Sequence, residues 1–215
     1  VSKCEVFNDA HSGVTAFYKC VRDNLDALIE RLELTVHSRE EWLDCHSEWK
    51  NTNDPVERAA KWYYSVAYSF GGLGRNFGRN TTGGISGKIR RALPAFEVIH
   101  KRFSDVTIEN SDWLALCESY DSADTVFYLD PPYLGTYSGM GYDTMSVEDH
   151  KRLIEWALNA KGFVAISGYA NPLYDGHDWD AVHSWDVACS LRGAAYNAGS
   201  GKEHLKHIDT GRGTA

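Results

Sequence analysis

The chain has 215 residues, of which 43% are hydrophobic and 24% are charged, a composition that excludes disorder and allows one α/β domain with an insertion. No apolar stretch reaches the roughly 18 residues that a membrane helix needs, and no secretory signal opens the chain. Five cysteines without a Cys-x-x-Cys pair indicate reduced thiols in a cytosolic protein, and we expect neither a metal site nor disulfides.

The net charge of −8 speaks against a protein that coats nucleic acid without specificity. The charge is uneven, because seven basic side chains and one acidic side chain lie between Arg75 and Arg102. A local basic stretch on an acidic chain is compatible with a dedicated surface for a polyanion.

Short apolar strands alternate with amphipathic helices along the chain, which is typical of an α/β parallel sheet. The predicted strands are residues 4–7, 106–108, 125–129, 163–167 and, with a weaker pattern, 185–188. The predicted helices begin at residues that can cap a helix N-terminus, namely Ser12, Ser38, Asp54 and Ser146. We expect the first helix to continue to Leu32 and the helix after Asp54 to extend its apolar face to Phe70. A helix over residues 89–103 is expected to bend or break near Pro94.

Residues 38–104 are helical and glycine-rich, and they interrupt this alternation as a predicted insertion. Glycine recurs between Gly71 and Gly87, where we expect a flexible loop. These glycines follow a helix, whereas a phosphate-binding loop for a dinucleotide would follow a strand.

Asp130-Pro131-Pro132-Tyr133 directly follows the predicted strand 125–129, which we expect to be buried. Ligands of open α/β sheets bind outside the carboxyl ends of the strands, so the motif occupies the expected reactive edge. Asp130 supplies an anionic acceptor, the two prolines expose rigidly placed carbonyls, and Tyr133 offers a face for stacking. This set suits an exocyclic amino group on a heteroaromatic base. For an isolated tetrapeptide, a simple turn that ends the strand is the alternative.

With this motif, the chain resembles the Dam-like DNA adenine-N6 methyltransferases of phages and bacteria, which use S-adenosylmethionine. The likeness also covers residues 5–9 with the following helix, residues 69–78 and residues 166–169. It implies a class I, Rossmann-like methyltransferase domain over residues 1–215, with a helical insertion at about 38–104 that recognises DNA. The family's first strand and glycine-rich cofactor loop would precede residue 1, so the resemblance implies a chain truncated at both ends, without its first strand and closing strand.

The resemblance gives roles to individual residues. The catalytic residues would be Asp130, Pro131, Pro132 and Tyr133. S-adenosylmethionine would be held by Asp9 at its ribose and by Asp112 and Trp113 at its adenine. Contacts to double-stranded DNA are expected from Arg75, Asn76, Arg79, Lys88 and Arg90. Without a site, Asp9 would be a helix cap, Asp112-Trp113 the start of a short helix, and the glycine-rich segment a solvated loop.

The implied reaction is methyl transfer to the N6 amino group of an adenine that is flipped out of the duplex. Asp130 and the Pro131 carbonyl would accept the amino protons, and Tyr133 would stack on the base. We expect this activity in the cytoplasm of a bacterial cell or a phage-infected host, for example in restriction-modification. Two alternatives remain open: the same chemistry on N4 of cytosine or a glutamine amide, and a DNA-binding remnant without catalytic activity.

Overall fold

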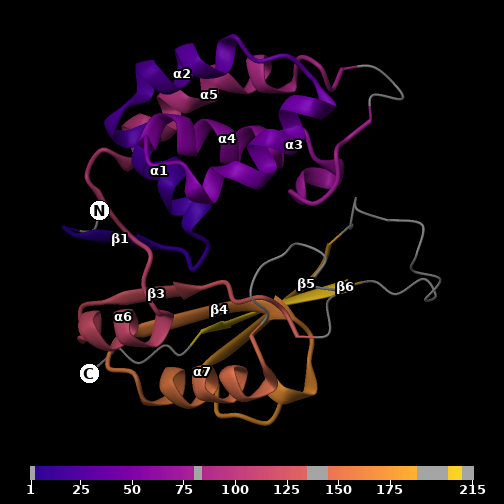
Figure 1. The fold of residues 1–215 in the computed structure, drawn as a ribbon. Helices are drawn as coiled ribbons and strands as arrows, with labels where there is room; N and C mark the ends of the chain where they lie inside the picture. The colour runs from indigo at the N-terminus through magenta and orange to yellow at the C-terminus, as the bar shows by residue number, and fades with distance from the viewer. Residues whose placement is uncertain (1–2, 80–83, 135–144, 188–202, 210–215) are drawn as a thin grey trace. The chain divides into compact units, whose positions relative to one another are not determined.

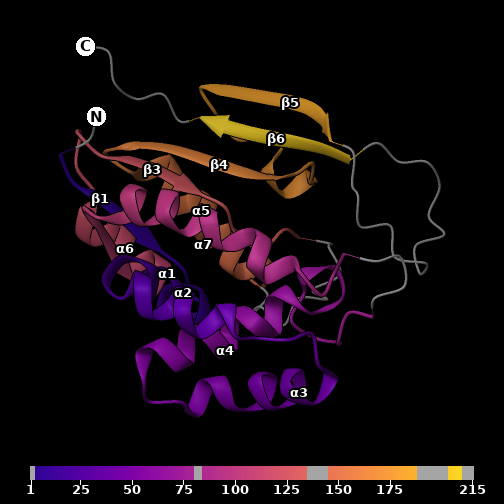
Figure 2. The same cartoon turned by 90° about the horizontal axis from the view of Figure 1, so that it is seen from above.

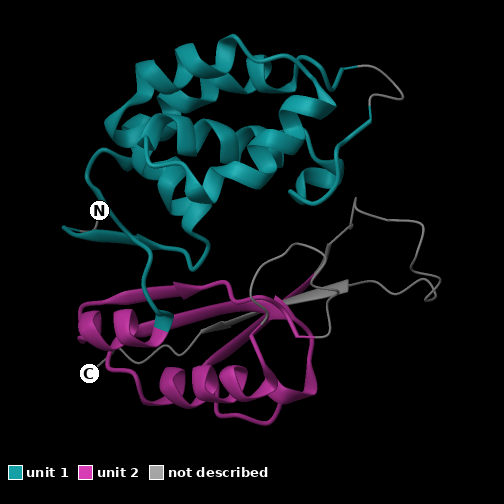
Figure 3. Ribbon diagram, viewed as in Figure 1, with its two compact units in different colours: residues 1–113, 139–141 teal, residues 114–138, 142–215 magenta. Residues whose placement is uncertain are grey.

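The computed structural model describes residues 3–79, 84–134, 145–187 and 203–209. The chain divides into two compact units (Figure 3), unit 1 with residues 1–113 and 139–141, and unit 2 with residues 114–138 and 142–215. Figures 1 and 2 show the helices and strands from two directions. In the part of the chain that the structure describes, no helix is long and apolar enough to cross a membrane.

Unit 1 contains a group of helices and a two-stranded sheet. The strands β1 (Glu5–Asn8) and β2 (Val106–Glu109) pair in parallel, as their apolar sequences predict. The helices are α1 (Ser12–Asp23), α2 (Leu25–Glu33), α3 (Arg39–Glu48), α4 (Pro55–Ala67) and α5 (Lys88–Phe103), with the 3₁₀ turns η1 (Trp49–Asn51) and η2 (Phe70–Gly72). A sixth helix, α6 (Trp113–Tyr120), begins at the end of residues 1–113 and continues into unit 2.

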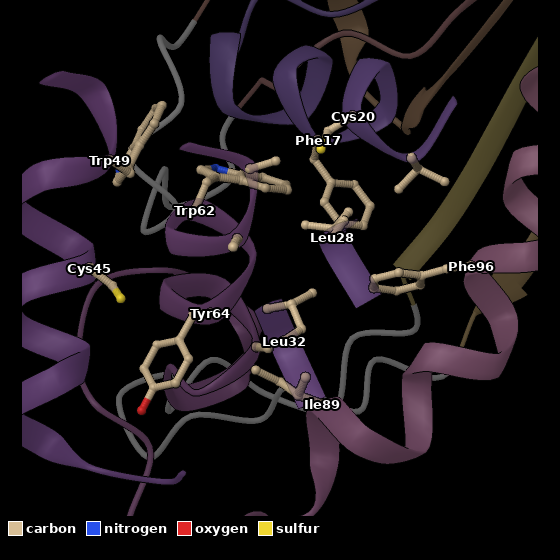
Figure 4. Packing of buried hydrophobic residues seen from close by; sticks show 14 of the residues in the cluster. Phe17, Cys20, Leu28, Leu32, Cys45, Trp49, Trp62, Tyr64, Ile89 and Phe96 are labelled. Carbon is tan, nitrogen blue, oxygen red and sulfur yellow. The ribbon is translucent and has the colours of Figure 1, made fainter. Parts of the chain in front are cut away.

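One apolar cluster joins helices α1 to α5 (Figure 4). Val21 and Leu28 are completely buried in it, and Phe17 stacks on Tyr63 with ring centroids 4.9 Å apart. Phe96 of α5 meets the ring of Phe17 edge-on at 5.3 Å. Because burial of each large apolar side chain contributes roughly 1.5–3 kcal/mol, this cluster accounts for the cohesion of the five helices.

Four expectations for these helices are corrected. The single helix predicted from Ser12 to Leu32 is two helices, because Asn24, a weak helix former, is non-helical at φ −141° and ψ 41°. The N-cap of α1 is His11, one residue before the predicted Ser12, and its ring Nδ1 accepts the N–H of Gly13 at 3.2 Å.

The helix α4 ends at Ala67, so Phe70 lies beyond its apolar face and is 65% exposed. The chain cannot continue as a helix there because Gly71 and Gly72 have positive φ angles of 64° and 76°. The helix α5 passes Pro94 without interruption, so the break that the sequence suggested near Pro94 does not occur.

Unit 2 contains a four-stranded sheet in the order β3-β4-β6-β5. Its strands are β3 (Val126–Leu129), β4 (Phe163–Tyr169), β5 (Ala181–Val187) and β6 (Glu203–Asp209). The helix α7 (Val147–Asn159) packs on this sheet, with Trp156 edge-on to Phe127 at 5.1 Å, and the 3₁₀ turn η3 (Pro172–Tyr174) follows β4. The strands β3 and β4 are parallel, as predicted.

The rest of this sheet differs from the expectation. The tail from Lys202 to Ala215 contains a strand, because β6 pairs antiparallel with both β4 and β5, and the sheet is therefore mixed. The strand β3 is not buried: it is the terminal strand of the sheet, and Val126 and Tyr128 on one of its faces are 74% and 64% exposed. The predicted strand end at Ala188 and the tail beyond residue 209 lie outside the described residues.

Candidate functional site

The carboxyl ends of β1 and β2 form one polar edge in unit 1. Since the strands are parallel, the segments that leave them start side by side. The Asn8 side chain donates to the Ser111 carbonyl at 3.1 Å and accepts the Ser111 N–H at 2.9 Å. The Asn110 side chain donates to the Asp9 carbonyl at 2.7 Å. These bonds bring the loop of Asp9 and the segment 112–113 to the same edge of the sheet.

Asp9 is half-buried on this edge, and its Oδ1 accepts the N–H of His11 at 2.7 Å. Among the described residues, none donates to its Oδ2. A carboxylate with one oxygen anchored and the other open is suited to accept a pair of neighbouring hydroxyl groups, which fits a ribose. Exposed Asp112 and half-buried Trp113 stand at the start of α6, so an acceptor and a flat ring come from the neighbouring segment.

The part of the glycine-rich segment up to Gly78 is closed into a hairpin by hydrogen bonds. The Gly78 N–H donates to the Tyr68 carbonyl and the Phe70 N–H donates to the Asn76 carbonyl, each at 2.7 Å. The Gly74 N–H donates to the Ser69 hydroxyl, also at 2.7 Å. We call residues 68–78 the glycine hairpin.

Packing on its neighbours holds the glycine hairpin in place. The ring of Phe77 stacks on His37 with centroids 4.6 Å apart, and the guanidinium of Arg39 lies 4.7 Å from the Phe77 ring centroid. The hydroxyl of Tyr68 donates to the Ser86 carbonyl at 3.0 Å, which joins the glycine hairpin to the segment just before α5.

The five predicted DNA-contacting residues come together around this junction. Arg75 and Asn76 lie in the glycine hairpin, Arg79 follows it, and Lys88 and Arg90 belong to the first turn of α5. All five are exposed. The partial positive charge of a helix N-terminus adds to that of the basic side chains, so this region of unit 1 attracts anions.

The motif residue Asp130 directly follows Leu129, the last residue of β3 in unit 2. Its Oδ1 accepts two hydroxyl groups, from Ser167 and from Tyr133, each at 2.7 Å. Ser167 comes from β4, which is parallel to β3 and places its own carboxyl end beside the motif. Of the residues that the structure describes, none donates to Oδ2. Asp130 is therefore anchored by one oxygen and presents the other.

The Tyr133 ring stands edge-on to Tyr169, with centroids 4.7 Å apart and an interplanar angle of 74°. Burial raises the pKa of Tyr133 above its ordinary value, and the hydrogen bond to Asp130 raises it further. The phenol therefore stays protonated and donates to the carboxylate at neutral pH.

The two prolines of the motif differ, although the sequence suggested that both carbonyls are exposed. The Pro132 carbonyl lies 3.0 Å from Nε2 of His150 on α7, so a hydrogen bond within unit 2 already occupies it. The Pro131 carbonyl accepts no hydrogen bond from the described part of the chain. Only Pro131 therefore offers a backbone acceptor next to Asp130.

Ser167, His150 and Tyr174 hold the motif in the structure, and no role was assigned to them from the sequence. Signals for two of them were present. Ser167 ends the predicted strand 163–167, and because the carboxyl ends of parallel strands meet at one edge, its place beside the motif could have been inferred. His150 falls in register with the buried residues Leu153 and Ala157 of an amphipathic helix, where a polar ring needs hydrogen-bond partners.

These features are typical of an α/β enzyme. Polar groups lie at the carboxyl ends of its parallel strands, and basic residues lie in and beside the glycine hairpin of a helical unit. A family model for D12 class N6 adenine-specific DNA methyltransferases matches residues 2–173. The chain therefore belongs to the D12 class N6 adenine-specific DNA methyltransferases, and it is a DNA-modifying transferase that methylates adenine at N6.

Two relatives support this assignment. The chain is 23% identical over 184 residues to the Type II methyltransferase M.CviBI of Paramecium bursaria Chlorella virus NC1A, an alignment that covers 80% of the chain and 69% of that protein. It is 28% identical over 217 residues to the Type II methyltransferase M1.LlaDCHI of Lactococcus lactis subsp. cremoris, with 87% of the chain and 75% of that protein covered.

Proposed function

We propose that residues 1–215 belong to one class I, Rossmann-like methyltransferase domain, in which residues 38–104 are an insertion that recognises DNA. The parallel pairs β1–β2 and β3–β4, each with polar groups at its carboxyl end, support this arrangement. The position of the basic residues around the glycine hairpin and the start of α5 supports the role of the insertion.

The proposed methyl donor is S-adenosylmethionine, whose sulfonium group makes the methyl carbon electrophilic. Asp9 would accept hydrogen bonds from its ribose hydroxyls. Asp112 would accept one from the amino group of its adenine, and Trp113 would stack on that ring. The support for this proposal is that one sheet edge carries all three residues.

The anchored carboxylate of Asp130 is the observation that carries the proposed chemistry. Its open Oδ2 and the Pro131 carbonyl would accept the two protons of the adenine N6 amino group. This would orient the nitrogen lone pair toward the methyl carbon. As the new N–C bond formed, the methyl–sulfur bond of the donor would break and leave a neutral thioether, S-adenosylhomocysteine, and one amino proton would pass to the Asp130 carboxylate. Tyr133 and Pro132 complete the pocket wall, with the Tyr133 ring stacked on the flipped base.

The proposed substrate is double-stranded DNA, contacted by Arg75, Asn76, Arg79, Lys88 and Arg90. Arginine suits a guanine edge or a phosphate, and asparagine suits adenine. Because two relatives are named Type II methyltransferases, we propose a role in restriction-modification, in the cytoplasm of a bacterial or phage-infected cell.

The test is the substitution Asp130→Asn. The amide oxygen can still accept the Ser167 and Tyr133 hydroxyls, so folding and DNA affinity should persist, whereas the charge that attracts the amino protons is lost. Turnover should fall on the order of 10²–10³-fold, as for the loss of one preorganised polar contact. Methylated bases would be quantified by mass spectrometry on oligonucleotides that carry adenine, cytosine or both at the target position.

The matched control is Glu155→Gln, which removes an exposed carboxylate from α7 in the same unit. A variant Asp130→Asn that keeps more than about a tenth of the wild-type rate, a barrier change under ~1.4 kcal/mol, would exclude Asp130 from the chemistry. Methylation of cytosine in place of adenine would contradict the proposed base.

A further inference from the structure

His150 is a buried titratable residue that the proposed chemistry does not use. It lies on α7 with 1% of its surface exposed. Its Nε2 is 3.0 Å from the Pro132 carbonyl, and its Nδ1 is 2.6 Å from the hydroxyl of Tyr174 in η3. A polar ring at such a position is costly unless it is hydrogen-bonded, and here both nitrogens have partners.

The direction of these two bonds follows from chemistry. A carbonyl oxygen can only accept, so Nε2 of His150 carries a proton and donates to Pro132. In the neutral ring, Nδ1 is then an acceptor, and the Tyr174 hydroxyl donates to it.

The titration of both groups supports this direction. Burial lowers the pKa of His150, although the bond to the Pro132 carbonyl opposes this, and burial raises the pKa of Tyr174 to about 12. Both groups are therefore neutral near pH 7. We call the two hydrogen bonds, from Tyr174 to His150 and from His150 to the Pro132 carbonyl, the relay.

We infer that His150 is a positioning residue for methyl transfer, which holds the backbone of the motif through the Pro132 carbonyl. The inference rests on the roles proposed above for Asp130 and the Pro131 carbonyl. In a Pro-Pro sequence both φ angles are fixed by the rings, so ψ is the main remaining freedom. A bond to the Pro132 carbonyl restrains ψ of Pro132, next to the peptide group that carries the Pro131 carbonyl.

Tyr174 fixes the tautomer that makes this bond possible. Its hydroxyl comes from the segment after β4, the strand that also supplies Ser167. The motif is therefore held at two points. Ser167 of β4 binds the Asp130 carboxylate, and His150 of α7, itself bound by Tyr174 of η3, binds the Pro132 carbonyl.

The test compares His150→Leu with His150→Gln in the full chain. Leucine fills the space without a donor, whereas the glutamine amide nitrogen can occupy the place of Nε2 and donate to Pro132. We expect His150→Leu to lower kcat about 10–10²-fold, in keeping with the cost of small misplacements, with KM for DNA within about twofold. His150→Gln should recover most of this loss, and Tyr174→Phe should fall between the two.

Leu153→Ala is the control for a merely structural role, because Leu153 is similarly buried on α7 but its side chain has no hydrogen-bonding group for the motif. At temperatures well below its melting point, this variant should keep the wild-type kcat. An unchanged kcat in His150→Leu, or an equal loss in Leu153→Ala at the same folded fraction, would overturn the inference.

The ring tautomer provides a readout that does not depend on activity. ¹⁵N NMR of the histidine ring should show the Nε2–H form of His150 at neutral pH, and the Nδ1–H form would overturn the relay. A wild-type chain that transfers no methyl group to adenine yet shows the Nε2–H form would contradict the proposed function, whereas the hydrogen bonds from Tyr174 through His150 to Pro132 would be supported.

Discussion

In unit 1, the carboxylate of Asp9 is oriented by His11, two residues away, whereas in unit 2 the carboxylate of Asp130 is oriented by Ser167, 37 residues away. The Pro132 carbonyl likewise depends on His150, 18 residues away, and His150 on Tyr174, a further 24. The Asp9 carboxylate is thus oriented by a neighbour in the sequence, although bonds to Asn110 hold its loop at the sheet edge. The Asp130 carboxylate takes one donor from its own motif, Tyr133, and one from the distant strand β4, and the Pro132 carbonyl depends on α7. We therefore expect variants of unit 1 to change affinities and variants of unit 2 to change turnover.

Among the variants that test this division, Asp9→Asn should have the largest effect, a loss of affinity for S-adenosylmethionine. The amide oxygen can still accept the His11 N–H, so the loop should keep its shape while the charge toward the ribose is lost. Hydrogen bonds to charged groups contribute roughly 1.5–3 kcal/mol, which corresponds to about 10–150-fold weaker binding of S-adenosylmethionine by calorimetry. Asp44→Asn, an exposed carboxylate on α3, is the control. A fall in kcat at saturating donor, with unchanged affinity, would contradict the expectation that variants of unit 1 change affinities.

Substitution of Arg75 in the glycine hairpin, or of Arg79 just after it, should affect DNA affinity alone. An arginine paired with a guanine edge should cost ~1–3 kcal/mol on the preferred duplex and much less on a scrambled one. An arginine on a phosphate should weaken all duplexes alike and reduce the salt slope by about one unit. Affinities of Arg75→Ala and Arg79→Ala would be measured at several salt concentrations, beside Arg152→Ala on α7. If Arg75→Ala and Arg79→Ala show the same affinity and salt slope as Arg152→Ala on every duplex, DNA binds elsewhere.

Removal of the Ser167 hydroxyl should affect turnover alone. One hydrogen bond contributes about 1 kcal/mol, so Ser167→Ala should lower kcat roughly fivefold, with DNA and donor affinities unchanged. Tyr133→Phe removes the second donor to the same oxygen, and the double variant should lose more than the two single losses predict. Tyr128→Phe should have a smaller effect, because Tyr128 donates to Ser167 and not to Asp130. Weaker DNA binding in Ser167→Ala would contradict the assignment.

The smallest expected effect is on stability at mildly acidic pH. The pKa of His150 is lowered in the folded protein, chiefly by burial, so the unfolded chain binds the proton first as the pH falls. His150 therefore contributes stability above an ordinary histidine pKa of about 6.5 that declines below it, by under about 1 kcal/mol between pH 7 and pH 6. Denaturant unfolding of the wild type and His150→Gln would compare the two slopes. Equal pH slopes would show that the ring is not buried in its neutral form.

Elements governed by neighbouring residues could be predicted from the sequence. Ser38, Asp54 and Ser146 cap their helices by accepting the N–H three residues later, as their sequences indicate. Some errors were local, at Asn24 and at Gly71-Gly72. Others arose where a distant segment decides: the charged segment 203–209 is a strand because β4 and β5 pair with it on both sides. The exposure of Val126 and Tyr128 on one face of β3 likewise depends on how the strand is covered.

The sequence by itself determined that a carboxylate, two prolines and a tyrosine follow a strand, and that a basic, glycine-rich segment lies in a helical insertion. Chain connectivity and local capping are enough for such features, because the residues involved are neighbours. Only the tertiary structure decided which oxygen of Asp130 is held, which proline carbonyl stays available and that the glycine segment up to Gly78 is closed into a hairpin. Each of these depends on a hydrogen bond or ring contact between residues brought together by packing, such as Ser167 with Asp130 or His37 with Phe77.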